Sequence, residues 1–299
     1  MDAASEFTDV VELAAMALKV AYRTVFLSDI HMGSSAARVD EAAAFLKHID
    51  CQTLYLVGDI IDMWRLKSRW HWPEANNKFV RRVLKMAKRG TRVVFIPGNH
   101  DEGARQFIGL NFGGVMVEQN AIHITADGRK LLVMHGDEVD VVIKHARLLS
   151  VIGSVAYDKL VMLNRVVNTI QRKFGRRPWS LSQAIKMRVK KACQHIAKFE
   201  QALVDEATNR GVDGVVCGHI HKAEIRRGTG EDETDYFNCG DWVESCTALV
   251  EHDDGTLRII DGIAFLEQMH AMEPVQDEET VLEDELPMLP AFGLSGTPA

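Results

Sequence analysis

Short apolar runs recur along the chain, and each is followed within three residues by Asp, Asn or His. Runs of this length and composition predict buried strands. Longer segments at 39–48 and 77–89 lie between them and have the pattern of helices. This alternation of strands and helices predicts an α/β layered fold. The five predicted strands occupy 25–27, 55–57, 93–96, 131–134 and 215–217.

Seven polar residues follow these strands, in the motifs SDIH, VGDIID, PGNHD, MHGD and CGHIH. In open α/β sheets ligands bind beyond the carboxyl ends of strands, so these side chains are predicted to share one site. Carboxylate, imidazole and amide groups suit Mn²⁺, with Fe or Zn²⁺ as alternatives, and not a metal that prefers thiolate. The predicted ligands of a centre with two divalent ions are Asp29, His31, Asp59, Asn99, His135, His219 and His221.

The composition predicts a globular protein of a reducing compartment. Its 299 residues are 46% hydrophobic, which suits one large domain or one domain with an insertion. The five cysteines are scattered without a CxxC pair, which favours a cytoplasmic location. Residues 1–20 lack the basic start and apolar core of a signal peptide, and no apolar stretch is long enough to span a bilayer.

Charge is distributed unevenly along the chain. The formal net charge is −7, yet residues 141–199 contain thirteen Lys and Arg against one acid, Asp158. A basic block in an acidic protein predicts an anionic ligand or surface. This block lies between the fourth and fifth metal motifs and has a mostly helical pattern. We therefore expect a catalytic domain from residues 1–140 and 208–268, a helical lid insertion at 141–207, and an acidic, Pro-containing, disordered tail at 269–299.

The ordered motifs DxH, GDxxD, GNHD, HGD and GHxH resemble those of the calcineurin-like metallophosphoesterase superfamily. The resemblance implies two packed β-sheets, a sandwich flanked by helices. It also implies that Asp59 bridges two ions, which would activate a water for in-line attack on phosphorus. One ion would be held by Asp29, His31, Asp59 and His221, and the second would be completed by Asn99, His135 and His219.

Four further residues have implied roles beside the ions. His100, oriented by Asp101, would stabilise the transition state or assist the departing oxygen. Asp62 and Asp137 would orient histidines or backbone groups and would not bind metal themselves.

The substrate depends on the insertion. Apolar residues within 148–170 follow helical spacing, and the next predicted helix, 180–199, is rich in Lys and Arg. Either these helices pack on the sheet with a solvated basic face, or they form a lid that takes the acyl chains of a lipid. In the second interpretation basic side chains meet phosphate or an anionic membrane surface. The lid residues concerned are Arg172, Lys173, Arg176 and Arg177.

This arrangement is similar to the UDP-2,3-diacylglucosamine hydrolase family, which also has a helical insertion between these motifs. Trp64, which would contact substrate, and a GDW element at 240–242 match that family, whereas RLK at 65–67 and His100 depart from it. The resemblance implies cleavage of the pyrophosphate of UDP-2,3-diacylglucosamine, in lipid A biosynthesis, to UMP and 2,3-diacylglucosamine 1-phosphate. The enzyme would act as a peripheral protein on the inner face of the cell membrane.

Other interpretations remain at this point. The departures are compatible with another lipid- or nucleotide-linked phosphodiester or phosphomonoester as substrate. A non-catalytic scaffold is disfavoured because all seven ligands are present. Nucleic acid is disfavoured as a partner because the aromatic residues of the basic block are sparse and form no stacking pattern. The oligomeric state is not predicted.

Overall fold

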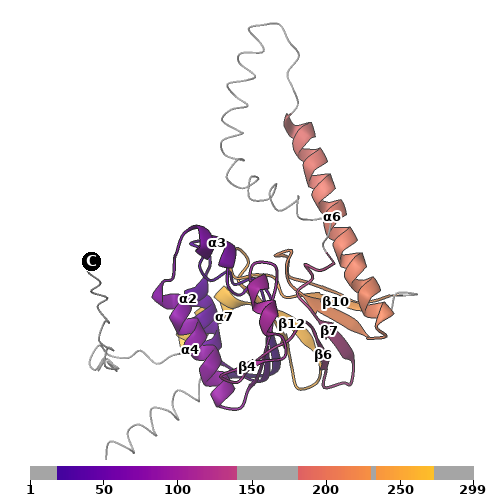
Figure 1. Cartoon of the computed structure of the whole chain (residues 1–299). Coiled ribbons are helices and arrows are strands. Elements are labelled where there is room, and N and C mark those ends of the chain that lie inside the picture. The colour runs from indigo at the N-terminus through magenta and orange to yellow at the C-terminus, as the bar shows by residue number, and fades with distance from the viewer. Residues whose placement is uncertain (1–18, 140–180, 230–233, 273–299) are drawn as a thin grey trace, which may run out of the picture.

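Two β-sheets face each other, and helices lie on the outer side of each (Figure 1). The computed structural model describes residues 19–139, 181–229 and 234–272. The predictions for the helix within 148–170, for the lid residues Arg172, Lys173, Arg176 and Arg177, and for the tail beyond residue 272 lie outside the described residues. The start of the predicted disordered tail, residues 269–272, is instead the end of the last helix, where Met269 is buried.

The first sheet has seven strands in the order β12-β11-β1-β2-β3-β5-β4. The central strands β1, β2, β3 and β5 are parallel, and β11, β12 and β4 pair antiparallel at the two sides. The bounds are β1 Val20–Leu27, β2 Ile49–Val57, β3 Arg92–Ile96, β4 Asn111–Phe112, β5 Val115–Val117, β11 Thr247–Glu251 and β12 Leu257–Asp261.

The second sheet has five strands in the order β6-β7-β8-β10-β9. Its three central strands, β7, β8 and β10, are parallel to one another, and the edge strands β6 and β9 are antiparallel to their neighbours. The bounds are β6 Ala121–Ile124, β7 Lys130–Val133, β8 Gly214–Cys217, β9 Glu224–Arg226 and β10 Asp235–Asn238. Each sheet therefore directs the carboxyl ends of its parallel strands toward one edge.

Helices complete a four-layer arrangement. On the first sheet α2 contacts both α4 and α7, whereas α6 lies on β8 and β10 of the second sheet. The short helix α3 follows β2, and the 3₁₀ helix η1 follows β3. The bounds are α2 Val39–Lys47, α3 Met63–Ser68, α4 Glu74–Lys88, η1 Glu102–Phe107, α6 Leu181–Asn209 and α7 Gly262–Met272.

The central strands are buried on both faces, which explains why they are continuous apolar runs and not alternating ones. In β1, Val25 and Leu27 pack into the core under the helices, while Phe26 packs into the core between the sheets. Tyr55 of β2 joins Phe26 there, with ring centroids 5.0 Å apart. Three stacked apolar layers thus hold the two sheets and their helices together.

The predicted strands and the two predicted helices between them are confirmed as β1, β2, β3, β7 and β8 and as α2 and α4. Helix α6 extends beyond the predicted segment 180–199 to Asn209, because Leu203, Val204 and Ala207 continue a buried face against the second sheet. This packed part of α6 lies inside the range 141–207 that was predicted as an insertion. Among the described residues, no helix is long and apolar enough to cross a membrane.

Candidate metal centre

The predicted ligands leave the carboxyl ends of five strands, β1, β2 and β3 in the first sheet and β7 and β8 in the second. Six of the seven side chains form two clusters of closely spaced ligand atoms, and a third group, made of His31, Asp59 and His100, connects the two. The seventh, Asn99, follows Gly98, whose Cα lies against Asp59 and His135. The site therefore spans the ends of both sheets, and neither sheet alone could form it.

The backbone of these loops is left-handed at five of the seven predicted ligands. Positive φ angles occur at Asp29 (51°), His31 (55°), Asp59 (53°), His219 (72°) and His221 (54°). Non-glycine residues adopt this region rarely and at an energetic cost, and such strain clusters at functional sites. The sharp turns point consecutive ligands toward one centre, so the fold maintains a costly backbone geometry here.

Three glycines of the motifs are required by close approach. A Cβ on Gly58 would lie 2.2 Å from His135 Nδ1, and one on Gly218 would lie 2.5 Å from Asp29 Oδ2. A Cβ on Gly98 would lie 2.5 Å from Asp59 Oδ1. Each distance is far below van der Waals contact. The glycines of GD, GN and GH therefore make room for the ligand of a neighbouring loop.

The first cluster joins Asp29 and His31 of the first sheet to His221 of the second. His221 Nε2 lies 3.1 Å from Asp29 Oδ1 and 3.3 Å from His31 Nε2. The other oxygen of Asp29 accepts a hydrogen bond of 2.8 Å from the backbone N–H of His219. That bond fixes the carboxylate and leaves Oδ1 directed at the two imidazoles.

The second cluster consists of Asp59, His135 and His219. His135 Nδ1 lies 3.0 Å from the carbonyl oxygen of Val57, which directs Nε2 toward Asp59 Oδ1 at 3.5 Å. Asp59 Oδ2 lies 3.8 Å from His31 Nε2. Asp59 thus stands between the clusters, as a bridging ligand would.

The electrostatics of the centre favour a cation. Burial alone would lower the pKa of His31, but hydrogen bonds with Asp29 and Asp62 raise it to about 9. Burial would also lower the pKa of His135, but the charge of Asp59 raises the pKa of this imidazole to about 10. Burial would raise the pKa of Asp59, yet His135 holds it below its usual range. Buried carboxylates thus retain their charge and hold positive charge beside them.

His100 is positioned by Asp62 and not by Asp101, which corrects the predicted pairing. Its Nδ1 lies 3.0 Å from Asp62 Oδ1, and its Nε2 lies 3.9 Å from Asp59 Oδ2. Asp62 also contacts His31 Nδ1 at 3.5 Å. Burial would raise the pKa of Asp62, but the hydrogen bonds with His100 and His31 lower it. Trp64 covers His100, with ring centroids 4.0 Å apart.

Asp101 is fully buried and acts on backbone instead. Its carboxylate accepts hydrogen bonds from the N–H groups of Gly98 (2.6 Å), Ile60 (2.8 Å) and Ile61 (3.2 Å). It also accepts one from the N–H of Asp59, at 3.3 Å. Burial and the neighbouring Asp59 raise the pKa of Asp101 to about 6. Asp101 therefore joins the GD and GN loops and holds the ligands in register.

Asp137 forms an ion pair with Arg105, at 2.7 and 2.8 Å. Among the described residues its carboxylate bonds a guanidinium, and its predicted role in orienting a histidine or backbone group stays a prediction. Arg105 Nη2 also donates to the carbonyl oxygen of Pro97, at 3.3 Å. The pair therefore links the loops after β3 and β7 beside the centre.

Sequence reasoning missed two contributors and singled out a third, the GDW element, without giving it a role. The carbonyl of Val57 orients His135, and a backbone group carries no sequence signal. Phe199 of α6 packs on His219, with ring centroids 5.7 Å apart. The sequence predicted that Phe199 lies in a helix, but it did not predict the contact with His219. Trp242 of the GDW element is fully buried, and its backbone N–H donates to the carbonyl oxygen of Asp29 at 3.1 Å. The element thus supports the first ligand loop from the core side.

The residues present fit divalent metal ions. Within each cluster, ligand atoms of three side chains lie within 4.8 Å of one another. The side-chain oxygen of Asn99 is buried and has no hydrogen-bond partner among the described residues. A buried amide oxygen in that condition needs a donor or a cation. Mixed nitrogen and oxygen donors without thiolate suit Mn²⁺, Fe or Zn²⁺.

A fold of two helix-flanked sheets, with Asp and His clusters on the strand ends, defines a metallophosphoesterase. The family model described as calcineurin-like phosphoesterase matches residues 22–223, and the chain belongs to that family. It is therefore a metal-dependent hydrolase.

Two curated relatives are both described as UDP-2,3-diacylglucosamine hydrolase. The protein of Aliivibrio fischeri (strain MJ11) is 24% identical over 245 residues, 77% of this chain and 94% of the relative. That of Blochmanniella pennsylvanica (strain BPEN) is 22% identical over 219 residues, 68% of this chain and 80% of the relative. Among solved structures, a Vps29 variant from Entamoeba histolytica has a TM-score of 0.36 and 14% identity, covering 80% of this chain and 98% of its own.

Proposed function

We propose that this protein hydrolyses the pyrophosphate of UDP-2,3-diacylglucosamine to UMP and 2,3-diacylglucosamine 1-phosphate, using two divalent ions. The observation that carries the reaction class is the pair of His and Asp clusters on either side of Asp59. The proposed ligands of the first ion are Asp29, His31, Asp59 and His221. Those of the second are Asp59, Asn99, His135 and His219.

Two such ions supply Lewis-acid stabilisation of phosphoryl oxygens and activate water as the nucleophile. The residues of the chain do the rest. Asp62 and Trp64 hold His100 beside the centre, with its Nε2 turned toward Asp59. From that position His100 would donate a hydrogen bond to a phosphoryl oxygen or to the leaving oxygen. Asp101 would act as a positioning residue through the backbone of the GD and GN loops.

The choice of substrate rests on the two relatives and on the segment between the fourth and fifth motifs. The C-terminal half of α6 brings that segment directly to the site, because Phe199 packs on both Gly136 and His219. We propose that the residues before this packed part form a lid over the metal centre, within the range 141–207. The lid would take the acyl chains, with Arg172, Lys173, Arg176 and Arg177 near phosphate or membrane.

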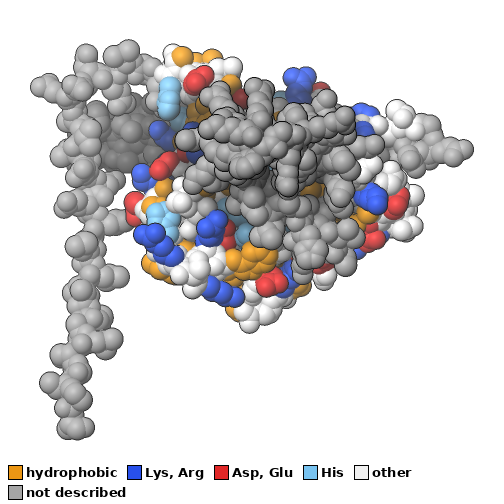
Figure 2. Space-filling view, turned by 90° about the horizontal axis from the view of Figure 1, so that it is seen from above, with side chains coloured by type: hydrophobic (Ala, Val, Ile, Leu, Met, Phe, Trp, Pro, Cys, Tyr) orange, Lys and Arg blue, Asp and Glu red, His pale blue; other side chains and the backbone are white. Residues whose placement is uncertain are grey.

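We also propose contact with an anionic membrane, supported by the surface formed by residues 63–72. Trp64 and Trp70 are 44% and 74% exposed, and this stretch contains three Lys and Arg but no acid. Tryptophan beside basic side chains is typical of protein surfaces that lie in the membrane interface. Figure 2 views the molecule from above and shows basic (blue), acidic (red) and apolar (orange) side chains intermixed on this side. Under this proposal the protein acts at the inner face of the cell membrane.

A second candidate is another lipid- or nucleotide-linked phosphoester. It is favoured by two features near the site, His100 itself and the basic run at 65–67, which follows the second metal loop. These basic groups would suit a leaving group or headgroup different from that of the two relatives.

The test uses full-length protein purified with Mn²⁺ and supplied with UDP-2,3-diacylglucosamine in detergent micelles. Mass spectrometry should show UMP and 2,3-diacylglucosamine 1-phosphate, and Asp59→Asn should abolish both products. Bis(p-nitrophenyl) phosphate and UDP-glucose serve as competing substrates. Rapid cleavage of either, with none of the acylated sugar nucleotide, would reject the proposed substrate while leaving the reaction class intact.

A further inference from the structure

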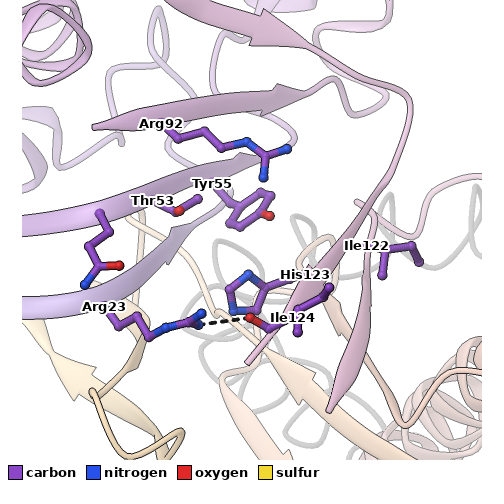
Figure 3. A pocket seen from close by; sticks show the side chains of 8 residues that line it. Arg23, Thr53, Tyr55, Arg92, Ile122, His123 and Ile124 are labelled. Carbon is purple, nitrogen blue, oxygen red and sulfur yellow. Dashed lines mark hydrogen bonds between the residues drawn. The ribbon is translucent and has the colours of Figure 1, made fainter. Parts of the chain in front are cut away.

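A second polar cavity lies away from the metal centre. Its volume is about 190 Å³, and it is lined by Arg23, Gln52, Thr53, Tyr55, Arg92, Ile122, His123 and Ile124 (Figure 3). Arg92 is the first residue of β3, and Arg23 and Gln52 belong to the amino-terminal halves of β1 and β2. The metal ligands follow the opposite, carboxyl ends of these strands. Strand β6 of the second sheet forms the facing wall, so the cavity lies between the two sheets.

The positive charge of this cavity exceeds the negative charge beside it. Glu251 is the nearby acid, and its carboxylate accepts hydrogen bonds from Arg23 Nη1 at 2.8 and 2.9 Å. It also lies 2.8 Å from His123 Nε2 and accepts from the N–H of Ala126 at 2.7 Å. Burial would raise the pKa of Glu251, but the hydrogen bond with His123 lowers it. The carboxylate of Glu251 therefore already has hydrogen-bond partners among its neighbours.

Arginine donors remain for a ligand. All hydrogen bonds of Arg23 within the described part of the chain leave from Nη1, so its Nε and Nη2 groups stay available. Arg92 forms no ion pair or hydrogen bond with any residue that the structure describes, although its side chain lines the cavity. In Figure 3 the two guanidinium groups lie on opposite sides of the space, with Tyr55 and His123 between them.

A buried hydroxyl without a partner points to the same space. Tyr55 is 0% exposed, and its hydroxyl has no hydrogen-bond partner among the described residues. Its ring is fixed by stacking on Phe26 and by edge contact with His123 at 5.6 Å. Leaving a buried hydroxyl unsatisfied costs free energy, so such a group calls for an acceptor. An oxyanion in the cavity would accept its hydrogen bond.

We propose that this cavity is a second binding site, for a phosphate group. Arginine guanidinium groups bind tetrahedral oxyanions through paired N–H donors, and the Tyr55 hydroxyl with the polar side chains of Gln52 and Thr53 completes the donor set. The volume equals that of roughly six water molecules, which is sufficient for one phosphate with room for a substituent. Ile122 and Ile124, 44% and 56% exposed, lie at its rim, where an apolar substituent would rest. The ligand is free phosphate or a phosphate monoester.

The test measures phosphate binding to full-length, Mn²⁺-loaded protein by isothermal titration calorimetry. Wild-type protein should bind a second phosphate in addition to any at the metal centre. Arg92→Gln should weaken the second event at least about tenfold, because it removes a charge-assisted bond. Tyr55→Phe should weaken it several-fold while keeping the stacked ring. Arg258→Gln, on β12 of the same sheet, removes an exposed arginine outside the cavity and should change neither event.

Hexyl phosphate, a monoester with an apolar substituent, replaces phosphate in a parallel titration and separates the two sources of the ligand. A second event with phosphate alone identifies the free ion, and one with hexyl phosphate identifies a monoester; either supports the site. A crystal soaked in tungstate should show anomalous density between Arg23, Arg92 and Tyr55. Equal binding by wild type and Arg92→Gln, or tungstate at the metal centre alone, would overturn the proposal. None of these residues belongs to the proposed catalytic site, so failure here leaves the hydrolase assignment untouched.

Discussion

Replacing Gly98 with alanine tests whether close packing between loops sets the positions of the metal ligands. The added Cβ would lie 2.5 Å from Asp59 Oδ1 and 2.6 Å from His135 Nε2, where ordinary contact begins near 3.4 Å. Both side chains, or the backbone at position 98, must therefore move by about 1 Å. A displacement of that size in a catalytic constellation costs roughly a hundredfold in rate. Gly98 does not have a positive φ, so alanine adds a collision without straining its own backbone.

The assay has two readouts, the metal content of dialysed protein by plasma mass spectrometry and kcat/KM for phosphodiester hydrolysis with Mn²⁺. Gly98→Ala should lose bound metal and about a hundredfold in kcat/KM. The matched control is Gly90→Ala, with φ of 104° and nothing within 4 Å of its Cβ. The control should lose about 1–2 kcal/mol of folding stability through its left-handed backbone and keep its metal. Wild-type metal content and rate in Gly98→Ala would refute the packing argument.

Three further predictions follow from the contacts of the site and the core. Asp101→Asn should lower the free energy of unfolding in urea by about 2–4 kcal/mol, because the new amide N–H₂ faces buried backbone donors; unchanged stability would contradict this. Asp62→Asn should lower kcat roughly tenfold through His100, and it should also lower stability because the folded protein holds the ionised carboxylate against His100 and His31; an unaltered kcat would argue against positioning. Glu251→Gln should cost about 2–3 kcal/mol near neutral pH. The folded-state pKa of Glu251 is lowered, so its contribution is present above the unfolded pKa and is lost as the pH falls through the folded one. Urea titrations at descending pH should therefore show wild type and Glu251→Gln converging, and a constant difference would disprove the linkage.

Metal binding near neutral pH should release about two protons, because carboxylates hold the pKa of His31 at about 9 and that of His135 at about 10 in the metal-free site. Titrations of metal in buffers of different ionisation enthalpy count the protons. A heat that does not depend on the buffer would show that the imidazoles are already neutral.

The strands and the residues predicted as ligands were readable from the sequence because both predictions follow local rules. Strands buried on both faces are continuous apolar runs, as at 25–27 and 55–57. The parallel strands of one sheet end at a common edge, so residues after them must converge. Asp29 and Asp59, which follow neighbouring strands of one sheet, were therefore predicted to lie together, whereas the meeting of the two sheets brings His135 to Asp59. The predicted helix at 39–48 was likewise readable from its 3.6-residue spacing.

The tertiary structure decided which side chains pair and where a second cavity forms. Asp101 follows His100 directly, yet four backbone N–H groups from other loops take its carboxylate, and Asp62, brought from the loop after β2, holds the imidazole. The end of α6 was set by packing on the second sheet. The cavity between Arg23 and Arg92 draws its walls from strands far apart in the chain. Hydrophobic spacing is a property of neighbours along the chain, whereas hydrogen-bond partners and cavities depend on how separate elements meet, so only the assembled sheets determine them.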